Sequence, residues 1–160
     1  MLKYLPLLLL TLLLSACSDE PAAVSNEENP LVTIQIPKYL NKKLNITTGN
    51  APTVKGVALG RMLFYDTQLS ADNTVSCASC HKQENAFNEP RATSIGIRGQ
   101  VVPRASMSLT NKVWESRYMW DGRHTSIEAL VNDPVTNPIE MGSDWASVIS
   151  KLKADSRYAG

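Results

Sequence analysis

The sequence predicts a mainly α fold in which short helices are separated by long irregular loops. Several segments place apolar residues at the i, i+3 and i+4 spacing of a helix face, whereas residues 82–106 carry scattered proline and glycine without a periodic pattern. A third observation concerns the pentapeptide at residues 77–81 (CASCH). It reads C-x-x-C-H, the attachment signature of a c-type haem. We therefore predict a c-type cytochrome-like haem domain with long irregular loops over residues 31–160.

The first elements of this domain are an extended segment and a helix. Residues 31–36 alternate apolar and polar side chains, which predicts a short extended stretch. From Val54 to Tyr65 the apolar residues occupy one face of a helix. Gly56 and Gly60 weaken this prediction, unless they allow close approach of another helix or of the haem.

The second half of the domain predicts further helices, at residues 107–114, 125–132 and 143–152. Thr125 or Ser126 is the expected N-cap of the middle helix, and Pro134 is expected to end it. Ser143 is the expected N-cap of the last helix, with Asp144 complementing its dipole. The long loop at 82–106 is expected to wrap the haem.

The chemistry of the C-x-x-C-H motif is specific. Cys77 and Cys80 can each form a thioether with a haem vinyl group, and His81 is placed to be the proximal iron ligand. The alternative is a structural zinc site, which needs four ligands. Its set would be these three residues with His124, because Cys17 lies at the end of an N-terminal apolar run. We favour one covalent haem c.

The N-terminus predicts export and a lipid anchor. Residues 1–16 combine one lysine, a short leucine-rich run and small residues, as a signal peptide does. The run ends in LSAC, which resembles the bacterial lipobox and implies lipidation of Cys17; the alternative is an ordinary signal peptide with a coincidental cysteine. Residues 17–30 are acidic and contain no basic residue, which predicts a disordered tether.

These features agree on a location in the cell envelope, on the periplasmic side, because haem c is attached outside the cytoplasm. Ser18 directly after the lipobox cysteine would direct a lipoprotein of enteric bacteria to the outer membrane. The formal net charge of +1 gives no reason to expect nucleic-acid binding.

Several motifs together resemble the bacterial di-haem cytochrome c peroxidases and their MauG-type relatives. They are LGRMLFYD at 59–66, SCASCH at 76–81, WDGR at 120–123 and Glu140-Met141. The resemblance covers roughly residues 57–158 and implies the N-terminal, peroxidatic haem domain of that family. A second C-x-x-C-H is absent from the sequence, so we expect a chain truncated before the second haem domain, or a partner that supplies that haem.

The resemblance implies roles for single residues. Cys77, Cys80 and His81 match the family's haem attachment and proximal ligand. Trp120 matches a tryptophan between the two haems that is implicated in electron transfer, with core packing as its alternative role. Glu140 matches a distal acid that moves a proton between the peroxide oxygens, with a solvated loop acid as the alternative. Arg104 matches an arginine near the haem, where it suits a propionate.

Three positions depart from the family. Ile97 stands where many members have a distal histidine that blocks the iron, and an isoleucine cannot ligate. Leu130 stands in place of a glutamine near the peroxide site. Ala105 stands in place of an asparagine associated with calcium, so the sequence supports neither the family's reductive gate nor its interdomain calcium.

The resulting expectation is a haem c peroxidase that reduces hydrogen peroxide to water. Its electrons would come from a small redox protein, such as a cytochrome c or a cupredoxin, or from a second haem domain. One alternative is a mono-haem electron-transfer lipoprotein, in which His124 or a methionine is the sixth ligand. Another is a MauG-like enzyme that oxidises a protein partner.

Overall fold

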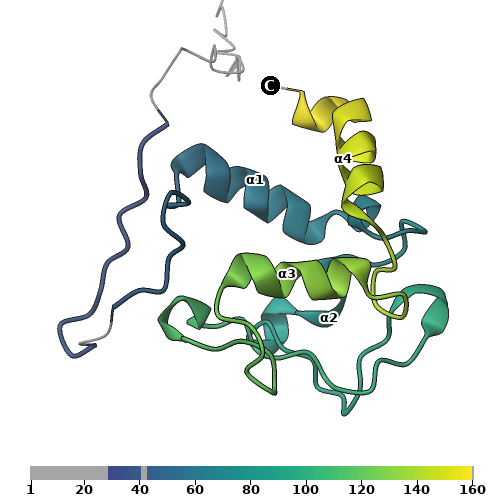
Figure 1. Cartoon of the computed structure of the whole chain (residues 1–160), viewed down its shortest axis with the longest axis horizontal. Coiled ribbons are helices and arrows are strands. Elements are labelled where there is room, and N and C mark those ends of the chain that lie inside the picture. The colour runs from purple at the N-terminus through teal and green to yellow at the C-terminus, as the bar shows by residue number, and fades with distance from the viewer. Residues whose placement is uncertain (1–28, 41–42, 160) are drawn as a thin grey trace, which may run out of the picture.

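The computed structural model describes residues 29–40 and 43–159, and in these residues it is built from helices, 3₁₀ turns and loops (Figure 1). The β pairing in this part of the chain is confined to isolated bridges, among them Leu31 with Thr53. The extended segment predicted at 31–36 therefore contributes one bridge rather than a strand. The predicted signal peptide, Cys17 and residues 17–28 of the tether lie outside the described residues.

Helix α1 spans Val54–Tyr65, as predicted. Thr53 caps it, with the hydroxyl oxygen accepting a hydrogen bond from the Gly56 N–H at 3.1 Å. Its apolar residues are largely uncovered, and Val57 is 51% exposed. A cavity of about 570 Å³ borders this face and is also lined by Phe64 and Phe87. The helix thus contributes one wall of a cavity.

Helix α2 is a single turn, Cys77–Cys80, and it packs against α1. Ser76 opens it with a reciprocal capping arrangement, in which the Ser79 hydroxyl accepts from the Ser76 N–H at 2.9 Å. The long loop that follows runs through the lower part of the molecule in Figure 1 and contains short 3₁₀ turns.

The helix predicted at 107–114 is wrong, because only Lys112–Trp114 forms a 3₁₀ turn there. The Ser108 and Thr110 hydroxyls donate hydrogen bonds to the Ala86 carbonyl, at 2.7 and 3.1 Å. These side chains fasten the segment to the neighbouring loop, which competes with helical pairing of the backbone.

Helix α3 spans Ile127–Thr136 and confirms Ser126 as the N-cap, but Pro134 does not end it. Proline has a backbone angle that a helix tolerates, and here it lies in the last turn, where it costs one hydrogen bond. The chain then folds back onto the end of the helix. The Met141 N–H donates to the Pro134 carbonyl at 3.1 Å and the Ser143 N–H donates to the Val135 carbonyl at 2.8 Å, so the last carbonyls are satisfied.

Helix α4 spans Trp145–Ala154, and its N-cap is Asp144 rather than Ser143. The Asp144 carboxylate accepts the Ser147 N–H at 2.9 Å, whereas the buried Ser143 hydroxyl makes no hydrogen bond with a described residue. A carboxylate is the stronger acceptor and also complements the helix dipole, which explains the shift by one residue.

The apolar core takes buried residues from α3 and α4 but none from α1, whose Leu63 is partly buried and packs against it. Its buried members are Leu69, Val135, Met141 and Val148. In the part of the chain described, no helix is long and apolar enough to cross a bilayer.

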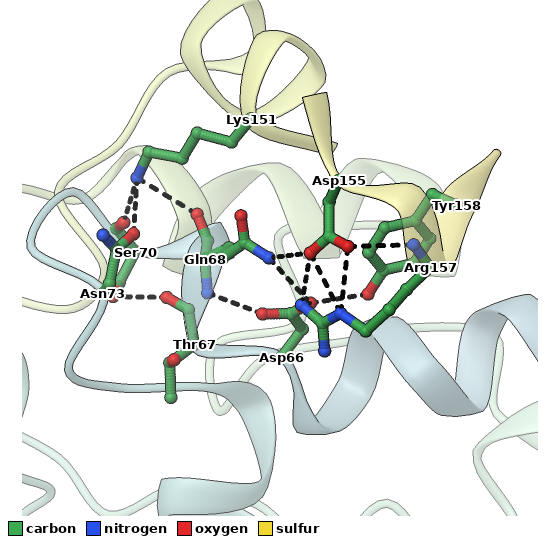
Figure 2. A network of polar contacts seen from close by, with 9 residues as sticks. All are labelled: Asp66, Thr67, Gln68, Ser70, Asn73, Lys151, Asp155, Arg157 and Tyr158. Carbon is green, nitrogen blue, oxygen red and sulfur yellow. Dashed lines mark hydrogen bonds and ion pairs between the residues drawn. The ribbon is translucent and has the colours of Figure 1, made fainter. Parts of the chain in front are cut away.

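A polar network joins the end of the described chain to the segment that follows α1 (Figure 2). The Asp66 side chain is only 4% exposed and accepts hydrogen bonds from the Tyr158 hydroxyl at 2.6 Å and the Arg157 guanidinium at 2.9 Å. Burial alone would raise the pKa of Asp66, but these bonds and the Gln68 N–H outweigh it and lower that pKa. Burial and the bond to Asp66 raise the pKa of Tyr158 to about 12. Lys151 adds a second tie, donating to the Ser70 carbonyl at 2.7 Å.

Candidate functional site

The C-x-x-C-H motif lies on α2 and on the residue that ends it, so the helix brings Cys77, Cys80 and His81 together. Both thiols are partly buried and neither is in a disulfide. Burial raises the pKa of Cys77, and burial with the charge of Glu89 raises that of Cys80, so both thiols are neutral at pH 7.

The imidazole of His81 is oriented by the loop that follows it. Its Nδ1 lies 3.0 Å from the Phe87 carbonyl oxygen. A carbonyl can only accept, so Nδ1 carries the proton and Nε2 keeps the lone pair that a metal ion needs. Burial lowers the pKa of His81, which favours the neutral, ligating form. Phe87 also lines the cavity beside α1, so the cavity adjoins the histidine.

These residues fit a c-type haem. Two thiols without a disulfide partner stand one helical turn apart, next to an imidazole held in the ligating tautomer, and an apolar cavity lies alongside. The zinc alternative would need His124 as well. Its Nε2 is instead 2.8 Å from the Asp133 carboxylate, and the described residues contain no group of three or more His, Cys, Asp and Glu that could hold a metal ion.

Glu140 lies in the turn that follows α3 and is partly buried, unlike a solvated loop acid. One carboxylate oxygen, Oε1, accepts a hydrogen bond from the Asn137 amide at 2.8 Å. Burial raises the pKa of Glu140 and the charge of Asp133 adds to this, while Asn137 and Arg123 oppose it. The charge of Glu140 is one of the smaller causes that raise the pKa of Cys80, after burial and the charge of Glu89.

The distal-loop position, Ile97, is joined to the same turn. The Ile97 N–H donates to the Glu140 carbonyl at 2.8 Å, and the Ile97 side chain is 1% exposed. Gly96 makes this close approach feasible, because a Cβ on it would lie 1.9 Å from the Ile139 carbonyl oxygen. The structure thus brings Ile97 and Glu140 into one backbone unit beside Cys80, whose sulfur lies 3.9 Å from the Ile95 carbonyl.

Trp120 and Arg104 lie together on the surface. Trp120 is 65% exposed and its indole N–H donates to the Ala105 carbonyl at 2.9 Å, so core packing is wrong as an explanation for this residue. Arg104 is exposed too, with a guanidinium nitrogen 3.7 Å from the Asp121 carboxylate. No residue on α2 makes a hydrogen bond with either side chain in the described structure.

The WDGR loop is held by charges. Arg123 pairs with Asp121 at 2.9 Å, and its Nε also donates to Asp133 at 2.9 Å. The hydrogen bond from His124 and the contacts with Arg123 lower the pKa of Asp133. Nε2 of His124 is engaged by Asp133, and Met141 is buried in the core.

Sequence reasoning missed three residues of this region. Asn137 holds Glu140, and Asp133 organises the WDGR loop. Glu89 has a side chain that is 5% exposed, and its Oε2 has no hydrogen-bond partner among the described residues. Only Asn137 had a usable signal, since it stands three residues before Glu140.

Two cysteines on one short helix and the histidine that ends it, within a mainly α domain with long loops, define a c-type haem domain. The chain belongs to the di-haem cytochrome c peroxidase family, whose model matches residues 54–160. This establishes the resemblance found in the motifs.

Individual relatives agree with this family. The chain is 38% identical over 121 residues to a cytochrome c peroxidase of Escherichia coli K12, covering 74% of this chain and 26% of that protein. It is 36% identical over 110 residues to the methylamine utilization protein MauG of Methylorubrum extorquens, covering 69% of this chain and 31% of that protein. The chain therefore spans about a quarter to a third of these curated relatives.

Solved structures share the fold. A MauG-like protein associated with microbial copper homeostasis superposes with a TM-score of 0.73 at 33% identity, covering 80% of this chain and 38% of that one. A variant of a dihaem peroxidase from Burkholderia thailandensis gives a TM-score of 0.55 at 25% identity, covering 64% of this chain and 31% of that one.

Proposed function

We propose that this chain is the peroxide-reacting haem domain of a di-haem peroxidase, reducing hydrogen peroxide to water. The observation that carries the proposal is the placement of Glu140. A partly buried carboxyl with a raised pKa shares one backbone unit with Ile97, and the Ile95 carbonyl oxygen of the same loop lies 3.9 Å from the sulfur of the haem-attaching Cys80. A non-ligating side chain and an acid at this position suit a reactive iron face.

Cys77 and Cys80 would hold the haem through thioether bonds, and His81 would bind the iron through Nε2. When bound, the haem iron supplies the redox chemistry. Arg104, which is exposed and only weakly paired with Asp121, has a guanidinium fork suited to a haem propionate.

Glu140 would move the proton. Its Oε2, which makes no hydrogen bond with another described residue, is the oxygen that can accept a proton from one peroxide oxygen and return it to the other. Hydroxide is a poor leaving group, so protonating the departing oxygen allows it to leave as water. A raised pKa makes the carboxyl a stronger base when ionised and helps it to hold the proton until it is returned.

Electrons would enter through the surface at Trp120. This indole is largely exposed and is held to the Ala105 carbonyl beside Arg104, so an electron donor can contact it directly. The donor would be a second haem domain, as the family name implies, or a small redox protein of the cytochrome c or cupredoxin type.

The test is the Glu140→Gln variant of the haem-loaded chain. Glutamine keeps the size and can still accept from Asn137, but it cannot take up the proton. We expect the rate of reaction with peroxide to fall at least about 100-fold, the usual contribution of general acid–base catalysis. An unchanged rate, or a ferric spectrum that is fully low-spin and insensitive to peroxide and cyanide, would favour an electron carrier instead.

Oxidation of a protein is the second candidate, because the MauG relative is almost as similar as the peroxidase relative. Both use the same haem face and differ in the substrate at the surface. Peroxide consumption by the haem-loaded chain with a small reduced cytochrome separates them. The cytochrome supplies the two electrons that a peroxidase needs for turnover, whereas a protein-oxidising enzyme takes those electrons from its protein substrate and should not turn over with the cytochrome alone.

We also propose that the protein is held at the cell envelope by lipidation of Cys17. Radioactive fatty acid should label the wild-type protein and not the Cys17→Ala variant. Labelling of neither, together with recovery in the soluble periplasmic fraction, would indicate an ordinary signal peptide.

A further inference from the structure

Asn137 is the residue that ends α3, and it makes both a side-chain and a backbone hydrogen bond with Glu140. Its side-chain Nδ2 donates to Glu140 Oε1 at 2.8 Å. Its side-chain Oδ1 accepts the Ile139 N–H at 3.2 Å, which closes a local turn. Its backbone carbonyl accepts from the Glu140 N–H at 3.0 Å and from the Gly142 N–H at 2.8 Å.

The two ends of this amide therefore have separate tasks. The oxygen builds the turn, and the nitrogen reaches the carboxylate. Because the turn is also fixed by the Ile97 N–H on the Glu140 carbonyl, both the backbone and one carboxylate oxygen of Glu140 are held. Only Oε2 is left without a partner among the described residues.

The charges around Glu140 come from two parts of the fold. Asp133 on α3 disfavours the ionised carboxylate, and Arg123 in the WDGR loop favours it. On α2, the Cys80 sulfur is a neutral thiol without the haem and would be a neutral thioether once the haem is attached, so it adds no charge beside Glu140. Asn137 is the neutral donor in direct contact, and its hydrogen bond favours the ionised form.

We propose that Asn137 is a positioning residue for Glu140, which presents Oε2 alone for proton exchange and keeps the carboxyl able to ionise. This inference rests on the proposed function of Glu140 and assigns a new residue to it. Without the amide donor, the carboxyl would hold its proton to higher pH and would rotate between two equivalent oxygens.

The decisive variant is Asn137→Asp. Aspartate has the same shape and keeps the oxygen that accepts from Ile139, so the turn is retained. It replaces the donor to Glu140 with a like charge, which raises the pKa of a neighbouring carboxyl. Asn132→Asp is the matched control: Asn132 is exposed on α3, and its side-chain oxygen accepts from the Trp145 indole at 2.9 Å, a bond that aspartate preserves.

The measurement is fluoride binding to the ferric haem-loaded chain across pH, followed by absorption. A neutral neighbouring carboxyl favours the bound anion, so affinity falls as pH rises through the pKa of that carboxyl. We expect Asn137→Asp to move this midpoint upward by about one pH unit or more, as a close like charge does. Asn132→Asp should leave the midpoint in place, and Glu140→Gln should remove the transition.

The outcomes separate the two proposals. If Glu140→Gln leaves both the fluoride transition and the peroxide rate unchanged, the proposed function fails. If Glu140→Gln behaves as expected but Asn137→Asp leaves the midpoint in place, the positioning role fails and the function of Glu140 stands. A uniform loss of activity in Asn137→Asp, with an unshifted midpoint and reduced thermal stability, would show a structural role only.

A measurement on the wild-type fold covers the case in which Asn137→Asp does not fold. In the reduced carbon-monoxide complex, which is diamagnetic, the side-chain amide signal of Asn137 should titrate with the same midpoint as Glu140. The titration should vanish in Glu140→Gln. An Asn137 signal that does not respond to pH would overturn the inference.

Discussion

Gly96 is the point at which one methyl group should disturb the proposed distal site. Its backbone φ of −93° suits any residue, so conformational strain is not the issue. The obstacle is space, since an added Cβ would lie 1.9 Å from the Ile139 carbonyl oxygen and 2.8 Å from the Glu140 Cα. These are backbone atoms and cannot turn aside as a side chain would. The two segments must separate by about 1.5 Å to reach the shortest ordinary contact of 3.4 Å.

The cost follows from what that separation breaks. The Ile97 N–H would lose its 2.8 Å bond to the Glu140 carbonyl, worth about 0.5–1.5 kcal/mol. The Ile97 side chain, now 1% exposed, would lose part of its burial, worth about 1.5–3 kcal/mol when complete. With about half of that burial lost, we expect Gly96→Ala to reduce the free energy of unfolding by about 1–3 kcal/mol.

Guanidinium unfolding of the haem-loaded chain measures this, with Ser150→Ala as the control. The Ser150 side chain is exposed on α4 and makes no hydrogen bond with a described residue, so alanine there should change the free energy of unfolding by no more than about 0.5 kcal/mol. The fluoride transition assigned to Glu140 should also move in Gly96→Ala and not in Ser150→Ala. A Gly96→Ala protein within about 0.5 kcal/mol of wild type would refute the close approach.

Three further predictions concern the haem, the polar network and the surface tryptophan. Cys77→Ala/Cys80→Ala should lose haem staining after denaturing electrophoresis, and retained staining would contradict covalent attachment through this motif. Asp66→Asn should lower the free energy of unfolding by about 1.5–3 kcal/mol at neutral pH, because the Asp66 carboxylate accepts charged and neutral bonds while 4% exposed. The folded-state pKa of Asp66 is lowered, so this stabilisation is present above the ordinary carboxyl pKa of 3.8 and is lost as pH falls further. In urea unfolding, the free energies of unfolding of the variant and the wild type should therefore converge in acid. A difference between them that stays constant with pH would contradict this prediction. Trp120→Phe should change the free energy of unfolding by less than about 1 kcal/mol, since the side chain is 65% exposed, while slowing the reduction of the haem in stopped-flow measurements. A large loss of stability with a normal rate of reduction would instead show that Trp120 has a structural role.

The elements that could be predicted from the sequence are those set by local chemistry. The C-x-x-C-H spacing places two thiols one turn apart and a histidine next to them whatever the rest of the chain does. Helix α1, the Ser126 cap of α3 and the apolar stripe of α4 follow from periodicity and from the hydrogen bonding of short polar side chains. The motifs shared with the peroxidase family also led to Glu140, because Glu140 and Met141 form a motif that can be recognised in the sequence alone.

Only the tertiary structure decided which contacts these residues make. The segment at 107–114 has helix-forming residues, yet Ser108 and Thr110 bond to the Ala86 carbonyl, which is distant in sequence, and no helix forms there. Pro134 stays inside α3 because it lies in the last turn, where it costs one helical hydrogen bond, and the returning chain bonds to the carbonyls of Pro134 and Val135. Whether Glu140 is a solvated acid or a partly buried one depends on the loop at Ile97 folding against it, and on Gly96 leaving room for that approach. Burial and long-range hydrogen bonds belong to the assembled chain, and they turn a loop carboxylate into a candidate proton carrier.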